Sequence, residues 1–97
     1  MTSNHKLTAV LHGRTITGTR HQDHRLIVAF DDGSTMTVHT AGSITGAATG
    51  GTIAKVRQQG TQLALDCEDG STLLIPLAEA TSPVMVRAKD HTLEYAD

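Results

Sequence analysis

The sequence predicts an all-β domain, a small barrel or sandwich of about eight or nine short antiparallel strands. Three observations predict this class. One stretch of the chain occurs twice, each copy has an Asp-Gly turn between alternating apolar residues, and the apolar runs are short. We expect the 97 residues to form a single domain, 1–97, made of the two copies and a C-terminal hairpin.

The repeated stretch covers residues 13–41 and 50–78. At an offset of 37 without a gap, 11 of the 29 aligned positions are identical, whereas average residue usage would give about two by chance. The chain therefore carries the same unit twice, and we interpret it as two tandem three-stranded meanders with pseudo-two-fold symmetry. The expected strands are 14–20, 24–30 and 34–39 in the first copy and 52–57, 61–67 and 71–76 in the second.

The Asp-Gly turn determines how the second and third strands of each copy pair. A two-residue loop would place apolar residues opposite polar ones. A three-residue loop, residues 31–33 with Gly33 in the left-handed region, pairs Val28 with Met36 and Leu26 with Val38. We therefore predict a type I turn with a glycine bulge. The equivalent pairs in the second copy are Leu65 with Leu73 and Leu63 with Ile75.

The break between the first and second strands is expected to be a hairpin tip as well. Asp23 aligns with Gly60, and both residue types tolerate the left-handed region. A three-residue loop would pair Ile16 with Val28, whereas a four-residue loop would use Val56 in the second copy. The sequence leaves these two registers open.

The flanking segments supply the remaining elements. "KLTAVL", residues 6–11, predicts a strand, and the small residues of "AGSITGAATG", residues 41–50, predict a linker. "LAEATS", residues 77–82, predicts one helical turn before Pro83. "VMVRA", "KDHT" and "LEY", which follow Pro83, predict a closing hairpin.

Composition and charge limit the classes of function. The formal net charge is −2 and the Lys and Arg residues are scattered, so a nucleic-acid partner is not favoured. The single cysteine cannot form an internal disulfide, and we expect a soluble cytoplasmic protein without a signal peptide or a membrane span. Phe30 and Tyr95 are the only aromatic residues, so we expect the chain to gain buried surface as a homodimer.

His21 and His24 in "HQDH" are the first candidates for metal ligands. A metal site needs three or four converging ligands, and His39 or a second chain could complete this one. On a hairpin tip, however, convergence of the two rings is not assured. The second copy has Gln58 and Thr61 at these positions and keeps the turn signals. We therefore expect a solvated turn, with a metal site at His21, His24 and His39 as the alternative.

Other residues of chemical interest have simpler interpretations. Cys67 continues an apolar strand face and is expected in the core. The pairs Asp31-Asp32 and Glu68-Asp69 lack the ligand spacing of calcium loops and are typical of turns. The glycine-rich linker lacks the Gly-Lys-Ser/Thr ending of a phosphate loop, so no cofactor is expected.

Arg20 and Gln22 recur in the second copy as Arg57 and Gln59. These four positions could mark a shared binding surface or could reflect duplication alone. No residues suggest a convergent catalytic set, so we expect a non-enzymatic interaction or structural module that offers strand edges or loops to a protein partner. The first alternative is a His-dependent metal-binding protein or small hydrolase. The second is a single-stranded nucleic-acid binder, for which the chain lacks stacking aromatics and a basic groove.

Overall fold

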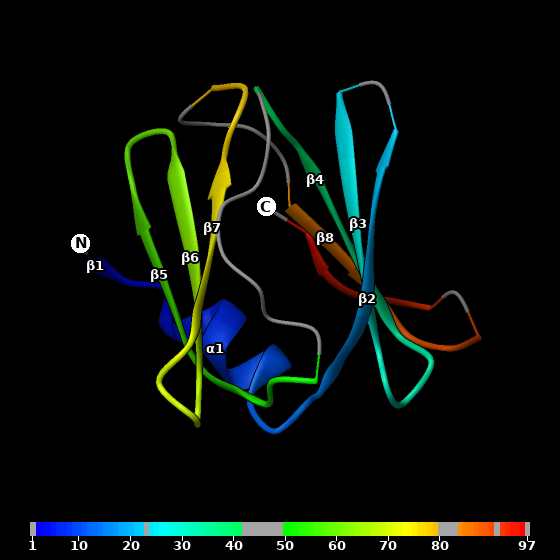
Figure 1. Ribbon diagram of the computed structural model, residues 1–97. Helices are drawn as coiled ribbons and strands as arrows, with labels where there is room; N and C mark the ends of the chain where they lie inside the picture. The colour runs from blue at the N-terminus through cyan, green and yellow to red at the C-terminus, as the bar shows by residue number, and fades with distance from the viewer. Residues whose placement is uncertain (1, 23, 42–49, 80–83, 91, 97) are drawn as a thin grey trace.

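The computed structural model confirms the all-β class and shows a sandwich-like arrangement of two antiparallel sheets (Figure 1). It describes residues 2–22, 24–41, 50–79, 84–90 and 92–96. The four-stranded sheet has the order β1-β5-β6-β7 and the five-stranded sheet the order β2-β3-β4-β8-β9. The elements are β1 (Thr2–Ser3), α1 (His5–Leu11), β2 (Ile16–Gln22), β3 (Arg25–Phe30), β4 (Thr35–His39), β5 (Ile53–Gln59), β6 (Gln62–Cys67), β7 (Thr72–Pro76), β8 (Val84–Arg87) and β9 (Leu93–Ala96).

Each copy of the repeat forms one meander, and the two meanders lie in different sheets. The first meander is β2-β3-β4 and the second is β5-β6-β7. Val28 lies opposite Met36, and Leu65 lies opposite Leu73, as the three-residue loop requires. Gly33 has a φ of 84°, a left-handed conformation that glycine adopts without steric cost. The predicted register of the second hairpin is therefore confirmed in both copies.

The first hairpin of each copy has a register that neither sequence interpretation anticipated. Ile16 lies opposite Phe30, and Thr19 lies opposite Val28. The expected pairing of Ile16 with Val28 is therefore wrong. The reason is a shorter turn than expected, because Gln22 already lies opposite Arg25 at the end of the hairpin. A β-bulge between Ile16 and Gly18 then shifts the register by one further residue. The second copy has the same irregularity at the equivalent place in β5.

Residues 6–11 belong to a helix rather than to the expected strand, so that prediction is wrong. The side-chain oxygen of Asn4 accepts a hydrogen bond of 3.0 Å from the backbone N–H of Leu7 and caps the first turn of α1. Leu7 and Leu11 lie one turn apart and are completely buried. The helix packs against β5 and also contacts β9, and it lies between the lower ends of the two sheets in Figure 1.

The core between the sheets is almost entirely aliphatic. Alternate residues of the strands point inward and are buried, which is the pattern that the period of two predicts. The buried set is Leu7, Leu11, Ile16, Leu26, Val28, Phe30, Met36, Val38, Ile53, Val56, Leu63, Leu65, Cys67, Leu73, Ile75, Leu77, Val84 and Val86.

The C-terminal segment forms the predicted hairpin, and its first strand joins the sheet of the first copy. β8 pairs with β4 and β9 pairs with β8, both antiparallel. In the segment expected to form a helical turn, Leu77 instead forms a β-bridge with Thr40. The rest of that turn, at residues 80–82, and the linker at 42–49 lie outside the described residues.

The two meanders are joined by backbone hydrogen bonds between positions that the sequence alignment makes equivalent. The backbone N–H of Ile16 donates to the carbonyl of Gly51, and the N–H of Ile53 donates to the carbonyl of Arg14, both at 2.9 Å. Each residue of one bond stands 37 positions from its counterpart in the other, the offset of the repeat. Further contacts of this kind are the hydroxyl pair Thr15–Thr52 and the bonds from Ala41 N to Pro76 O and from Ala78 N to His39 O.

Candidate functional site

The three histidines expected as alternative metal ligands all lie near Thr40, at the end of the first meander where β2 turns into β3. His21 is on β2, and its Nε2 lies 3.1 Å from Thr40 Oγ1. His39 lies opposite Arg25 on β4, and His24 stands between β2 and β3. Within the described part of the chain, no three His, Cys, Asp or Glu side chains form a group that could hold a metal ion. A site completed by a second chain stays a prediction.

Cys67 is in the core, as the sequence predicted, and only 5% of it is exposed. Burial raises the pKa of its thiol above the ordinary value, and the nearby carboxylates of Asp69 and Asp66 act in the same direction. A hydrogen bond with Ser71 opposes these effects. A buried thiol with a raised pKa is mostly protonated at neutral pH, which makes Cys67 unsuited to nucleophilic chemistry.

The acidic residues of the Asp-Gly turns are engaged within their own turns. Asp32 Oδ1 accepts hydrogen bonds from the backbone N–H and the hydroxyl of Ser34. Asp69 accepts the equivalent pair from Ser71, at 2.9 and 2.6 Å. The hydroxyl hydrogen bonds are the main reason that the pKa of each aspartate is lowered. These serine hydroxyls therefore serve the turn geometry rather than a reaction.

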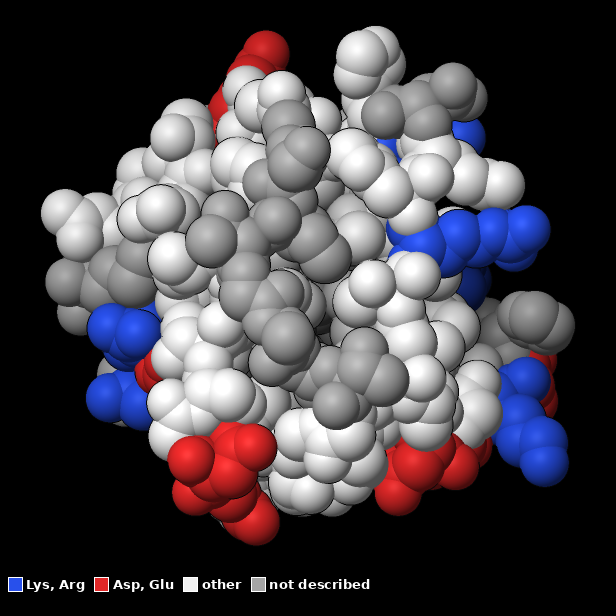
Figure 2. Space-filling view, in the orientation of Figure 1, with Lys and Arg blue, Asp and Glu red and all other residues white. Residues whose placement is uncertain are grey.

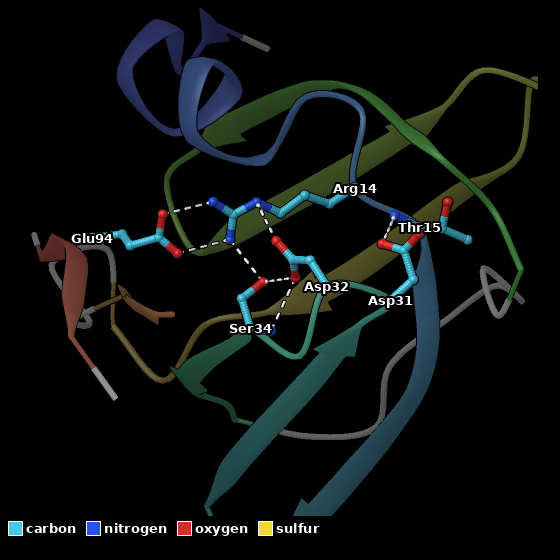
Figure 3. A network of polar contacts seen from close by, with 6 residues as sticks. All are labelled: Arg14, Thr15, Asp31, Asp32, Ser34 and Glu94. Carbon is cyan, nitrogen blue, oxygen red and sulfur yellow. Dashed lines mark hydrogen bonds and ion pairs between the residues drawn. The ribbon is translucent and has the colours of Figure 1, made fainter. Parts of the chain in front are cut away.

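Arg14 links the first of these turns to the C-terminal hairpin (Figure 3). Its guanidinium donates to both carboxylate oxygens of Glu94, at 3.0 and 2.8 Å, and to Ser34 Oγ at 2.7 Å. Its Nε lies 3.6 Å from Asp32 Oδ2. The bond with Glu94 is the main reason that the pKa of Arg14 is raised. Because these charges satisfy each other, the cluster holds β9 to the β3–β4 turn.

The outer face of the five-stranded sheet has a different character. On β3, Arg25 lies directly opposite His39 of β4, and Ile27 lies opposite Arg20 of β2. Arg20, Arg25 and His39 are exposed, and Ile27 is half-buried between them. Register partners have their side chains on the same face of a sheet, so these four residues adjoin. We call Arg20, Arg25, Ile27 and His39 the basic face.

Carboxylates are missing from the described residues that surround the basic face. The other outward positions that strand pairing places on this sheet are Gly18, Gln22, Ala29, Thr35, Thr37, Met85, Arg87, Leu93 and Ala96. Neither Arg20 nor Arg25 has a hydrogen bond or ion pair with a described residue. In Figure 2, acidic side chains gather mainly at the lower end of the molecule, while Lys and Arg project from the two sides where the sheets present their outer faces.

The second meander provides an internal comparison, because it holds the equivalent arginine in a neutral cluster. Arg57, the counterpart of Arg20, donates to both carboxylate oxygens of Asp66, at 2.5 and 2.8 Å. The hydroxyl of Thr72 donates to the same carboxylate at 2.9 Å. The bond with Arg57 is the main reason that the pKa of Asp66 is lowered. The first meander has Ala29 in place of Asp66, so Arg20 lacks this partner.

The four polar positions considered as a shared surface belong to two sheets. Arg20 and Gln22 lie on β2 in the five-stranded sheet, and Arg57 and Gln59 lie on β5 in the four-stranded sheet. A surface that used all four would need a partner that reaches both sides of the sandwich. The sequence comparison did not associate Arg25 with this surface because the second copy has glutamine at that position.

A comparison with protein-family models, with curated proteins and with solved structures finds no significant match for this chain. The described residues also contain no helix that is long and apolar enough to cross a membrane. The chemistry of the basic face is therefore the basis for a functional proposal.

Proposed function

We propose that this chain is a non-enzymatic interaction module that holds an acidic segment of a protein partner on the basic face. The observation that carries the proposal is the pair Arg20 and Arg25, exposed on neighbouring strands and without a carboxylate partner among the described residues. The planar guanidinium group matches a carboxylate with two parallel hydrogen bonds. Ile27 supplies apolar contact between the two charges.

An acidic protein segment suits this face better than single-stranded nucleic acid. Nucleic-acid surfaces of this kind combine positive charge with aromatic side chains on which bases stack. Of the two aromatic residues, Phe30 is buried and Tyr95 packs against the core.

The same proposal includes a homodimer in the cytoplasm. The core contains a single buried aromatic ring, so additional apolar surface buried between two copies would add to its stability. β9 ends the five-stranded sheet, and its outer edge has no strand partner among the described residues, which supports pairing with a second copy. The single cysteine, which is buried and free, is compatible with a reducing compartment.

Binding of a fluorescent 20-residue poly-L-glutamate, followed by anisotropy at low salt, tests the function. The test variant is Arg20→Gln/Arg25→Gln. The control is Lys55→Gln/Arg57→Gln, which removes the same total charge from the outer face of the other sheet. We expect the test variant to bind about tenfold more weakly, because each exposed charge contact is worth about 0.7 kcal/mol.

The control variant is expected to stay within about twofold of the unmodified protein, since Arg57 is already engaged by Asp66. Equal losses in both variants would show that the binding follows net charge and not the basic face. Tighter binding of oligo-dT of the same length would replace the protein partner with a nucleic acid. Thermal melts of all variants by circular dichroism control for folding.

A further inference from the structure

Leu93 is the exposed large hydrophobic residue of the described chain, with 48% of its surface accessible. It lies opposite Arg87, whose side chain is also exposed, so it shares the outer face of the five-stranded sheet with the basic face. A single exposed leucine needs no explanation by itself. Its position relative to Arg25 is relevant to ligand binding, because Arg25 on β3 and Leu93 on β9 lie at opposite ends of one diagonal across this sheet.

The length of that diagonal follows from the strand pairing. Three strand spacings separate β3 from β9, which amounts to about 14 Å across the sheet. Along the strands, Arg25 is level with His39, whereas Leu93 is level with Arg87 and Thr35. Four residues separate these two levels on β4, a rise of about 13 Å. The diagonal is therefore about 19 Å, which an extended peptide covers in about six residues.

The surface under this diagonal is continuous with both ends. It crosses β4 near Thr37 and β8 near Met85, which lie opposite each other and are half-buried. Neither residue carries a charge. A peptide on this path would leave the positive end and pass over neutral and apolar side chains before it reached Leu93.

We infer that the ligand is an extended segment with acidic residues at one end and a large apolar residue about six positions away. The carboxylates contact Arg20 and Arg25, and the apolar side chain contacts Leu93. This inference rests on the proposed function and specifies its partner. We infer the acidic end of the ligand from charge complementarity with the two arginines, and its apolar end from the exposed side chain of Leu93.

Three short peptides test the inference by titration at low salt, with fluorescence anisotropy as the readout. The first is Glu-Glu-Glu-Ser-Gly-Ser-Gly-Ser-Leu, in which leucine stands six positions after the last glutamate. The second has serine in place of leucine. The third has the composition of the first, with leucine moved directly after the glutamates. Each is also made in reversed order, because either chain direction could lie on the diagonal.

In one chain direction, we expect the first peptide to bind about fivefold more tightly than the second and the third. Leu93→Ser should abolish this preference. Leu74→Ser, which replaces an outward leucine of the four-stranded sheet, should preserve it. If all three peptides bind equally in both directions and all depend on Arg20 and Arg25, the inference is overturned while the proposed function stands. If none binds, the proposed function fails as well.

Discussion

The substitution Ala29→Asp should recreate, on the first meander, the cluster that neutralises Arg57 on the second. Positions 20, 29 and 35 are equivalent to 57, 66 and 72, and the first copy already has Arg20 and Thr35 at two of them. The new carboxylate would accept hydrogen bonds from both side chains, as Asp66 does from Arg57 and Thr72. The basic face would then keep one uncompensated arginine in place of two.

Two magnitudes follow. Loss of one exposed charge contact, worth about 0.7 kcal/mol, should weaken poly-L-glutamate binding about threefold. An exposed arginine–carboxylate pair stabilises a protein by about 0.5 kcal/mol, which roughly offsets the poor strand preference of aspartate. We therefore expect Ala29→Asp to leave the free energy of unfolding nearly unchanged. In an Arg20→Gln background, the same substitution should be more destabilising by about 0.5 kcal/mol.

A double-mutant cycle on these two positions, by urea unfolding at low salt, measures the coupling directly. Anisotropy titrations of the same four proteins measure the affinity. A coupling of zero together with unchanged affinity would refute the reasoning, because Arg20 would then not behave as the counterpart of Arg57. Full loss of binding would show that position 29 contacts the ligand itself.

Three further predictions concern the scaffold. Leu11→Ala should lower the free energy of unfolding by about 2–5 kcal/mol in urea titrations, because Leu11 is completely buried between α1 and the sheets; a cost below about 1 kcal/mol would contradict that packing. Gly70→Ala should lower the free energy of unfolding by about 1 kcal/mol, because Gly70 has a φ of 88°. Gly33→Ala should lower it by at least as much, since the new Cβ would also lie 2.9 Å from Cγ of Lys89. If either variant were as stable as the unmodified protein, the left-handed turn at that glycine would be excluded. The depressed pKa of Asp66 means that its contribution to stability is present above the ordinary carboxyl value of 3.8 and is lost as the pH falls towards the lower folded value. The melting temperature of Asp66→Asn should therefore lie below that of the unmodified protein at pH 7 and approach it at pH 2, and a constant difference would argue against the ion pair.

The sequence allowed prediction of the turns where two independent signals agree. At the second hairpin, the Asp-Gly pair and the apolar pattern favour the same register, and the structure has it. At residues 6–11 the signals conflict. Leu7 and Leu11 are four positions apart, which places them on one face of a strand and also on one face of a helix. The Asn4 cap decides in favour of the helix, and that capping bond becomes visible only when the backbone is known.

The basic face could not be recognised in the sequence for a related reason. A three-residue loop at the first hairpin would have placed Arg20 opposite His24, on the same face as Leu26 and therefore towards the core. The shorter turn, with Gln22 opposite Arg25, instead places Arg20 opposite Ile27, on the outer face. Identity between the copies drew attention to Arg20, whereas the distinctive chemistry arises where the copies differ, as at Ala29.

The pairing of β8 with β4 has a consequence for how the chain is made. The first meander is synthesised before the second, yet the sheet that contains it gains its last two strands only when residues 84–96 have left the ribosome. Until then the outer edge of β4 lacks the strand that pairs with it in the finished fold. The meander that is made first is therefore the last to gain its strand partner. A premature stop before β8 would leave the edge of β4, in the first copy, without that partner.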